Sequence, residues 1–330
     1  MRKVRWGVLG TAGIADTCTI PGMLEAENCE LYAIAGRNPE KVDDFRERFG
    51  FRKGYYSLDE MLDDPEVEAV YIPLSNDLHR SWVIRAAEKG KHILCEKPLG
   101  ASEAECREMI RAADANGVIL MEAFAYLHSP LMAAIKRELD AGTIGDVLYI
   151  DSTFLTSCYD MSNIRMRKET CGGSLYDLGC YNTTQILWLL GEEPAEIKAA
   201  ADFSDEKVDM FTQAFMKFAD GKRASMKCGM VLERSVGLSG EFFRMDSVVI
   251  FGTKGSLTCY AQFNEAGELS YTVKAAGVSE TKTLTVPQNY RLEVEQLGRC
   301  ITDGETPHVS HEFTLRNART MDRILKEIGY

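Results

Sequence analysis

The chain has 330 residues, a length that predicts two domains because single hydrophobic cores stop growing near ~250–300 residues. Its net charge of −12 and its pI of about 5.1 argue against nucleic acid and anionic membranes as partners. No run reaches the ~18 apolar residues of a membrane span, and no signal peptide is expected. Ten scattered cysteines without a Cys-x-x-Cys pair favour a reduced, cytoplasmic protein without a metal site.

The first predicted element is a strand over residues 4–9, followed at once by a turn of small residues. The pattern is a degenerate form of the G-x-G-x-x-G/A dinucleotide fingerprint: Gly10-Thr11-Ala12-Gly13-Ile14-Ala15. Small residues let the backbone approach a pyrophosphate, and the next helix can offer its N-terminal N–H groups to that anion. We therefore expect these six residues to bind a dinucleotide.

Strands and helices alternate as far as residue 122. Strands are expected at 29–35, 69–72, 91–94 and 118–121, and helices at 39–49, 57–62, 79–89 and 102–116. Asn38, Ser57 and Ser102 are the expected N-caps of three of these helices. This alternation predicts a doubly wound parallel sheet, a Rossmann domain spanning residues 1–122.

The end of the second strand indicates which dinucleotide binds. NAD-selective sites carry a carboxylate there, but this chain has Gly36, Arg37 and Asn38. The planar guanidinium of Arg37 suits a 2′-phosphate, and Lys41 lies one helical turn further on. We expect NADP to bind, with NAD as the alternative cofactor. Alternatively, Arg37 is simply a solvated loop residue.

The strand at 91–94 delivers Lys97 in the stretch Cys95-Glu96-Lys97-Pro98. Ligands of open parallel sheets sit beyond the carboxyl ends of the strands, and the proline prevents the sheet from continuing. A lysine fixed there can act as a cation or as a proton-transfer partner. On its own, the motif favours an ordinary surface loop, but its position after a dinucleotide-type first strand reverses that preference.

The pattern changes after residue 123. A helix at 130–140 leads to seven expected strands, at 147–156, 196–203, 210–218, 224–231, 247–251, 256–260 and 269–273. Helices at 290–303 and 311–328 end the chain. We expect an α+β domain over residues 123–330, built on a large, mostly antiparallel open sheet.

A second motif lies in this domain, with the sequence Cys171-Gly172-Gly173-Ser174-Leu175-Tyr176-Asp177-Leu178-Gly179-Cys180-Tyr181. The two glycines allow close packing of a loop. A helix that begins near Asp177 would place Asp177 and Tyr181 on one face, four residues apart. An ammonium near Tyr181 would favour its phenolate, which could then serve as a general base. Taken alone, this motif favours a structural role, with Tyr181 as a core aromatic residue and Asp177 as a charge at a helix N-terminus.

In combination, these motifs resemble the Gfo/Idh/MocA oxidoreductases over essentially the whole chain. The resemblance rests on the fingerprint turn and on Cys95-Glu96-Lys97-Pro98, Met121-Glu122-Ala123-Phe124 and Asp177-Leu178-Gly179-Cys180-Tyr181. Most family members carry histidine where this chain has Tyr181. Tyrosine at that position is similar to the branch with glucose–fructose oxidoreductase, xylose-type sugar dehydrogenases and dimeric dihydrodiol dehydrogenase.

The resemblance implies an NAD(P)-dependent dehydrogenase that acts on the CH–OH group of a cyclic sugar, polyol or trans-dihydrodiol. It implies catalysis by Lys97 and Tyr181, with Asp177 binding or orienting the substrate. Leu74, Asn76, His79 and Glu96 would join Lys97 around the nicotinamide ribose, and Tyr126, Asn163 and Arg165 would line the substrate pocket. It also implies a homodimer or homotetramer formed through the C-terminal sheet.

Two other functional classes remain open from the sequence. The chain could be a non-catalytic NADP-binding sensor, although Lys97, Asp177 and Tyr181 together speak against this. It could also be a Rossmann-like methyltransferase, which usually needs an acidic residue after the second strand and gives no reason for Lys97.

Overall fold

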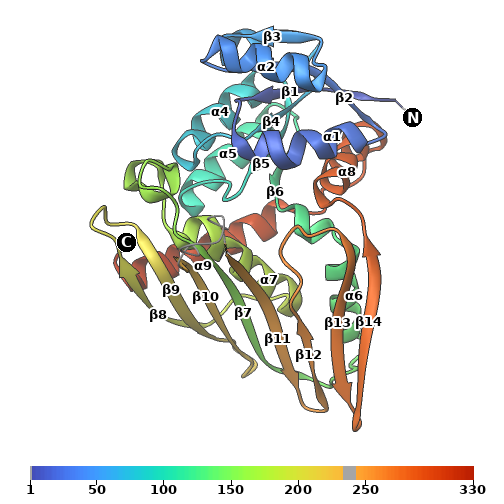
Figure 1. The fold of residues 1–330 in the computed structure, drawn as a ribbon, viewed down its shortest axis with the longest axis vertical. Coiled ribbons are helices and arrows are strands. Elements are labelled where there is room, and N and C mark those ends of the chain that lie inside the picture. Colours follow the sequence, from blue (N-terminus) through green and yellow to red (C-terminus); the bar gives the residue numbers. More distant parts are fainter. Residues whose placement is uncertain (1, 233–242) are drawn as a thin grey trace, which may run out of the picture. The chain divides into compact units, whose positions relative to one another are not determined.

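The computed structural model describes residues 2–232 and 243–330 (Figure 1). Contacts divide the chain into two compact units. The first comprises residues 1–128 and 287–315, and the second comprises residues 129–286 and 316–330. The sequence analysis placed residues 287–315 with the C-terminal domain. They belong to the first unit because helix α8 (Asn289–Asp303) packs against α1 (Ile20–Glu25), β1 (Val4–Leu9) and β2 (Cys29–Ala35).

The first unit contains the expected parallel sheet. Its six strands lie in the order β3-β2-β1-β4-β5-β6, where β3 is Lys53–Tyr55, β4 is Ala69–Ile72, β5 is His92–Glu96 and β6 is Leu120–Ala123. The order reverses between β1 and β4, the kind of position at which doubly wound sheets bind ligands. The structure therefore confirms the Rossmann architecture.

The helices of this unit follow the expected capping chemistry. Asn38 caps α2 (Pro39–Phe49), Ser57 caps α3 (Leu58–Leu62), and Ser102 caps α5 (Glu103–Ala115). Each of these side chains accepts a hydrogen bond from a backbone N–H in the first helical turn, which satisfies a donor that has no intrahelical partner. Helix α4 (Asn76–Glu88) begins three residues earlier than the sequence predicted, and it packs beside α5.

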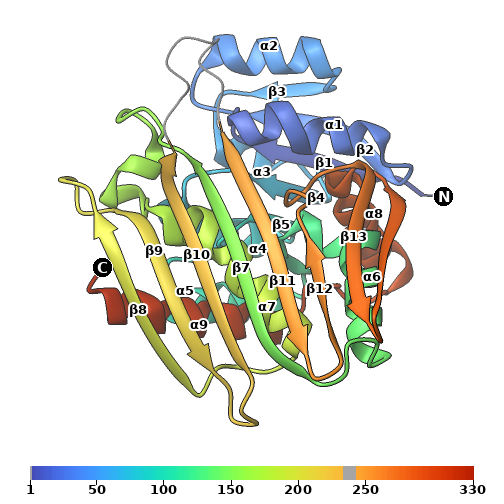
Figure 2. The same ribbon diagram turned by 60° about the horizontal axis from the view of Figure 1, so that its bottom comes forward.

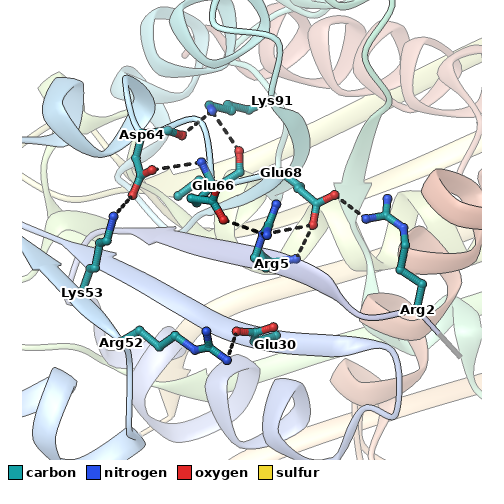
Figure 3. Close-up of polar contacts among 10 residues, drawn as sticks. Arg2, Arg5, Glu30, Arg52, Lys53, Asp64, Glu66, Glu68 and Lys91 are labelled. Atoms are coloured by element: carbon teal, nitrogen blue, oxygen red, sulfur yellow. Dashed lines mark hydrogen bonds and ion pairs between the residues drawn. The ribbon is translucent and has the colours of Figure 1, made fainter.

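A network of charged side chains holds the amino ends of the parallel strands (Figure 3). The ammonium of Lys91, just before β5, donates to the carbonyl oxygens of Asp64 and Val67 at 2.7 and 2.8 Å. Glu68, just before β4, pairs with both Arg2 and Arg5. These charges stabilise the end of the sheet opposite the carboxyl ends of its strands, where the predicted cofactor-binding residues Gly10, Arg37 and Lys97 lie.

The second unit is built on an eight-stranded sheet in the order β14-β13-β12-β11-β7-β10-β9-β8 (Figure 2). Among the described strands of this sheet, only β7 and β10 pair in parallel, so the expected mostly antiparallel sheet is confirmed. The strands are β7 (Val147–Ser157), β8 (Glu196–Phe203), β9 (Asp209–Lys217), β10 (Arg223–Leu232), β11 (Arg244–Gly252), β12 (Gly255–Cys259), β13 (Gly267–Ala275) and β14 (Val278–Val286).

Helices cover one face of this sheet. Helix α6 (Pro130–Asp140) packs on β13 and β14, and α7 (Cys180–Leu190) packs on β7 and β10 (Figure 2). On the opposite face, the apolar side chains of Phe215, Met245 and Phe251 are 41%, 51% and 48% exposed. The last helix, α9 (His311–Ile328), has the bounds that the sequence predicted, and its first five residues belong to the first unit.

Candidate functional site

The turn after β1 has the geometry that the fingerprint predicts. Gly10 adopts φ +128°, which a side chain would strain, and a Cβ there would lie 3.1 Å from Cδ2 of Leu74. The N–H of Gly10 donates to the carbonyl of Ala35 at 2.8 Å. Glycine at this position therefore lets the loops after β1, β2 and β4 meet at the carboxyl edge of the sheet. The helical segment that follows begins at Gly13 and contains a π-helical stretch, η1 (Ala15–Thr19).

The loop after β2 and the first turn of α2 each carry one exposed cation. Arg37 and Lys41 are both exposed, and the side chain of Asn38 is used in capping α2. A Cβ on Gly36 would lie 3.5 Å from the methyl group of Thr11, so this loop packs against the fingerprint turn. The exposed cations, with no carboxylate among residues 36–38, fit a phosphorylated ribose.

Glu96 ends β5 and turns its side chain inward. Tyr71 of β4 donates its hydroxyl to Oε1 of Glu96 at 2.5 Å, and Thr19 donates to the same hydroxyl oxygen at 2.9 Å. Burial and the neighbouring carboxylate raise the pKa of Tyr71 well above its usual range. Oε2 of Glu96 accepts from the backbone N–H of Lys97 at 3.3 Å. The backbone of the half-buried Lys97 is therefore fixed by a hydrogen bond where the chain leaves the sheet. The Lys97–Pro98 peptide is cis.

His79 lies between two loops at the carboxyl edge. Its Nδ1 is 2.9 Å from the carbonyl oxygen of Pro98, and its Nε2 is 3.0 Å from that of Leu74. The ring is fully buried, which lowers the pKa of His79, although the neighbouring carbonyl oxygens oppose this. Both ring nitrogens thus contact backbone carbonyls. Asn76 is the first residue of α4 and lies in the same region of the chain.

In the second unit, Arg165 and Asp177 form an ion pair with 2.7 Å between Nε and Oδ2. Arg165 belongs to the 3₁₀ helix η3 (Ile164–Met166), and Asp177 to the π-helical η5 (Leu175–Gly179), which leads into α7. The guanidinium also lies 5.0 Å from the centroid of the Tyr159 ring. The charge of Asp177 raises the pKa of Arg165 against the effect of burial, and interactions with Tyr159 and Tyr181 add to the rise.

Tyr181, in the first turn of α7, lies among aromatic rings. Its ring centroid is 5.5 Å from that of Phe154 and 5.1 Å from that of Phe263, and the side chain is 9% exposed. The hydroxyl accepts a hydrogen bond from Nδ2 of Asn264 at 3.3 Å. Asn264 adopts φ +63°, a left-handed conformation that asparagine tolerates better than most residues. The phenol is thus held by packing and by a hydrogen bond, close enough to Arg165 for electrostatic interaction.

A buried carboxyl group anchors the helix that carries Asp177 and Tyr181. Asp209, at the start of β9, accepts hydrogen bonds through Oδ2 from the backbone N–H of Leu175 at 2.8 Å and from the hydroxyls of Ser174 and Thr212, both at 2.6 Å. Burial raises the pKa of Asp209 to about 6, and these hydrogen bonds oppose the rise. Asp209 therefore fixes the start of η5.

The two glycines before this helix pack as the sequence predicted. A Cβ on Gly172 would lie 2.5 Å from the carbonyl oxygen of Arg165, and a Cβ on Gly173 would lie 2.1 Å from Oδ1 of Asp209. Gly173 also adopts φ +105°, and its N–H donates to the carbonyl of Arg165 at 2.8 Å. The glycines thus bring η3 against η5, which places Arg165 beside Asp177.

The remaining predicted pocket residues have structural contacts of their own. Asn163 caps η3 and accepts from the N–H of Arg165 at 3.0 Å. Tyr126, in the 3₁₀ helix η2 (Ala125–His128) of the first unit, is 2% exposed and packs edge-on against Phe124. Their roles toward a substrate stay predictions.

Three residues with prominent positions were not singled out from the sequence, namely Asn264, Asp209 and Glu122. Asn264 lies in a turn, Asp209 begins a strand, and Glu122 was noted only as part of a motif. A polar residue at the end of an apolar strand was the only signal that pointed to Glu122. Within residues 2–232 and 243–330, no three histidine, cysteine, aspartate or glutamate side chains gather as a metal site requires. None of the helices described there is long and apolar enough to cross a membrane.

Comparison with known proteins agrees with the geometry of both units. Residues 4–124 match a family described as "Oxidoreductase family, NAD-binding Rossmann fold" (GFO_IDH_MocA), and residues 132–258 match "GFO/IDH/MocA C-terminal domain". A D-xylose 1-dehydrogenase (NADP(+)) of Haloferax volcanii is 34% identical, covering 97% of this chain and 95% of its own length. A trans-1,2-dihydrobenzene-1,2-diol dehydrogenase of Xenopus laevis is 28% identical, with 98% of each chain covered.

Solved structures show the same fold. The crystal structure of KijD10, a 3-ketoreductase from Actinomadura kijaniata, in complex with NADP and TDP-benzene, has a TM-score of 0.92 and 26% identity, covering 99% of this chain and 98% of its own. The two family matches together span most of the sequence. The chain belongs to the Gfo/Idh/MocA family and is an NAD(P)-dependent oxidoreductase.

Proposed function

We propose that this enzyme transfers hydride between NADP and a hydroxyl-bearing carbon of a cyclic sugar, polyol or trans-dihydrodiol. The observation that carries the proposal is the fixed phenol of Tyr181, held by Asn264 in an aromatic enclosure near the Arg165–Asp177 pair. Relatives named as an NADP-dependent xylose dehydrogenase and as a dihydrodiol dehydrogenase support this substrate class. Both of those substrates carry a hydroxyl group on a ring carbon.

The carboxyl edge of the Rossmann sheet fits a dinucleotide. The strained, side-chain-free position of Gly10 leaves the backbone accessible to phosphates, and Arg37 and Lys41 offer charge for a 2′-phosphate. We propose that Thr11, Ala12, Gly13, Ile14 and Ala15 surround the pyrophosphate. Leu74, Asn76, His79 and Glu96 would shape the ribose side, where His79 and Glu96 act through the loops that they hold. When bound, the nicotinamide supplies the hydride acceptor.

The protein would contribute position and proton transfer. In the proposed oxidation, Tyr181 accepts the proton of the substrate hydroxyl while Lys97 holds that oxygen and stabilises negative charge on the phenol. Arg165 adds a cation near the phenol, but its charge is largely offset by Asp177. Asp177 would orient a second hydroxyl group or act through Arg165. Tyr126 and Asn163 stay candidates for the pocket wall.

The outer face of the eight-stranded sheet is the proposed surface for a homodimer or homotetramer. Phe215 of β9 and Met245 and Phe251 of β11 expose apolar side chains there, and Tyr149 stacks on Phe251 with 6.4 Å between ring centroids. Replacing both Met245 and Phe251 with aspartate should lower the mass measured by light scattering to that of one chain. An unchanged mass would contradict this surface. All ten cysteines are free thiols, which fits the cytoplasmic location that we propose.

A spectrophotometric screen tests the proposed function. Wild-type protein with NADP⁺ is assayed against ring-containing sugars, inositols and trans-diols, with open-chain alcohols as the matched controls. We expect NADPH formation with at least one cyclic compound and slower formation with NAD⁺. A protein that binds NADP without turnover of any compound would instead be a sensor. One that binds S-adenosylmethionine and not NADP would be a methyltransferase.

A further inference from the structure

Glu122 is a buried carboxyl group at the carboxyl edge of the Rossmann sheet. It lies in β6, opposite Cys95 of β5 in the parallel register, and its side chain is 3% exposed. Oε1 accepts from the backbone N–H of Leu99 at 2.8 Å, and Oε2 accepts from the hydroxyl of Thr314 in the first turn of α9 at 2.7 Å. Glu122 thus connects the turn after Lys97 to a neighbouring helix.

The turn that contains Lys97 is held from three sides. Glu122 holds Leu99 from β6, and His79 of α4 contacts the carbonyl of Pro98 at 2.9 Å. A Cβ on Gly100 would lie 2.9 Å from the methyl group of Met109 of α5, so the chain also packs closely there. A change at Glu122 would therefore move the backbone that carries the lysine.

We propose that Glu122 is a positioning residue for Lys97, fixing the turn after β5 and placing an ionisable carboxyl group beside the ammonium. The inference rests on the proposed function, in which Lys97 acts on the substrate oxygen. Two hydrogen bonds and a shared sheet edge place Glu122 against this turn, and no sequence motif assigns it a role there.

The surroundings of Glu122 let it titrate near neutral pH. Burial raises the pKa of Glu122 to about 7, the charge of Glu96 adds to the rise, and the ammonium of Lys97 opposes it. From β5, the buried thiol of Cys95 also faces the carboxyl group, and α9 contributes the uncharged hydroxyl of Thr314. Near neutral pH, a modest change of pH therefore changes the charge beside Lys97.

Glu122 can be protonated without losing its hydrogen bonds to Leu99 and Thr314. The N–H of Leu99 can only donate, but the hydroxyl of Thr314 can reverse and accept from a protonated carboxyl group. In Glu122→Gln, the amide oxygen can accept from Leu99 and the amide NH₂ can donate to Thr314. This variant therefore reproduces the protonated state at every pH and retains the geometry.

Glu293 provides a matched control. It lies in α8 of the same unit and is fully buried, and neither of its carboxyl oxygens has a hydrogen-bond partner among the described residues. Burial and the charge of Glu96 raise the pKa of Glu293 well above its usual range, which favours the uncharged carboxyl group. Glu293→Gln replaces it with an uncharged side chain of the same shape.

The test compares the pH profiles of kcat and kcat/KM for wild type, E122Q and E293Q. We expect wild-type kcat to fall as pH drops through about 7. E122Q should be flat in this range, at about a tenth of the wild-type plateau. The Kd for NADP, measured by tryptophan fluorescence, should change less than ~3-fold, and E293Q should behave as wild type. Infrared difference spectra of wild type should show a buried carboxyl group that deprotonates near pH 7 and is missing in E122Q.

Each outcome has a distinct meaning. An active wild type whose inflection persists in E122Q overturns the role of Glu122 alone, and so does an E293Q profile that matches E122Q. A wild type without turnover of any compound contradicts the proposed function and this role together. If E122Q does not fold, the infrared titration of wild type decides, because the lack of a carboxyl group that titrates near pH 7, separate from Asp209 near pH 6, overturns the inference.

Discussion

The guanidinium of Arg165 lies 2.7 Å from the carboxylate of Asp177, and this ion pair joins η3 to η5 directly before the helix of Tyr181. The Asp177 side chain is only 11% exposed, so its negative charge needs the neighbouring guanidinium of Arg165 to offset the cost of burial. The sequence analysis assigned Asp177 to substrate and Arg165 to the pocket wall. Their pairing means that a change in either residue will also disturb the geometry around the other.

Arg165→Leu should therefore destabilise the protein. The variant leaves the Asp177 carboxylate buried without a cation, and partial exposure limits the expected loss of unfolding free energy to about 2–3 kcal/mol. Urea denaturation measures this loss. The control is the double variant Arg165→Leu with Asp177→Asn, which removes both charges and should recover at least about 1 kcal/mol. If the double variant is less stable than Arg165→Leu, the unpaired charge of Asp177 is not the cause of the lost stability.

Gly173→Ala should be severely destabilising because the new Cβ would lie 2.1 Å from Oδ1 of Asp209 at φ +105°. We expect a loss of at least about 3 kcal/mol from the clash and the backbone strain together. Gly221→Ala is the matched control, since Gly221 adopts φ +93° and no described atom outside its two chain neighbours lies within 4 Å of the new methyl group. This variant should lose about 1 kcal/mol. Equal losses in the two variants would argue against a special constraint at Gly173.

The pH dependence of stability should depend on two buried acids. The pKa of Asp209 is raised to about 6 and that of Glu122 to about 7, from ordinary values of 3.8 and 4.5. Because the folded state holds these protons more tightly, their contribution is fully present below the ordinary values and is lost as pH rises through about 6 and 7. As the pH rises from its ordinary pKa to its raised pKa, each group should lower the unfolding free energy by up to about 1.4 kcal/mol per pH unit.

Thermal unfolding between about pH 5 and 8 checks this expectation in wild type and in the double variant Asp209→Asn with Glu122→Gln. The wild-type Tm should fall relative to that of the variant as the pH rises. Parallel curves for the two proteins would contradict the raised pKa values.

Arg37→Ser should weaken NADP selectively. Loss of charge-assisted hydrogen bonds to a 2′-phosphate, worth about 1.5–3 kcal/mol, should raise the Kd for NADP roughly ten- to a hundredfold and leave that for NAD within ~3-fold. Fluorescence titration measures both constants. The control is Arg52→Ser, because Arg52 pairs with Glu30 among the charged side chains of Figure 3 and should affect neither cofactor. Equal loss of both cofactors in Arg37→Ser would remove the 2′-phosphate role.

Local patterns were sufficient to predict most of the fold. Helix caps and helix bounds depend on interactions between residues close in the sequence, which can be recognised from the sequence alone. Examples are the caps Asn38, Ser57 and Ser102 and the last helix, 311–328. The strand β14 was missed because it exposes most of its residues at the sheet edge and lacks an apolar stripe. Helix α8 belongs to the first unit because it packs against α1, β1 and β2, which are far away in the sequence. No local sequence pattern predicts such contacts.

The candidate site divides in the same way. Motif spacing was enough to single out Gly10, Lys97, Asp177 and Tyr181. The sequence could not show that Asp209 and Glu122 would be buried acids, because a carboxyl group acquires a raised pKa only from its tertiary surroundings. The contact between Asn264 and Tyr181 joins residues 83 positions apart, so it likewise depends on the assembled sheet.

Single-turnover hydride transfer in Lys97→Met, Tyr181→Phe and the double variant tests most directly whether the two residues act on one proton transfer. We predict a loss of at least ~100-fold in each single variant, a similar loss in the double variant, and an NADP Kd within ~3-fold of wild type. Wild-type rates in either single variant, or losses that multiply in the double variant, would contradict the account.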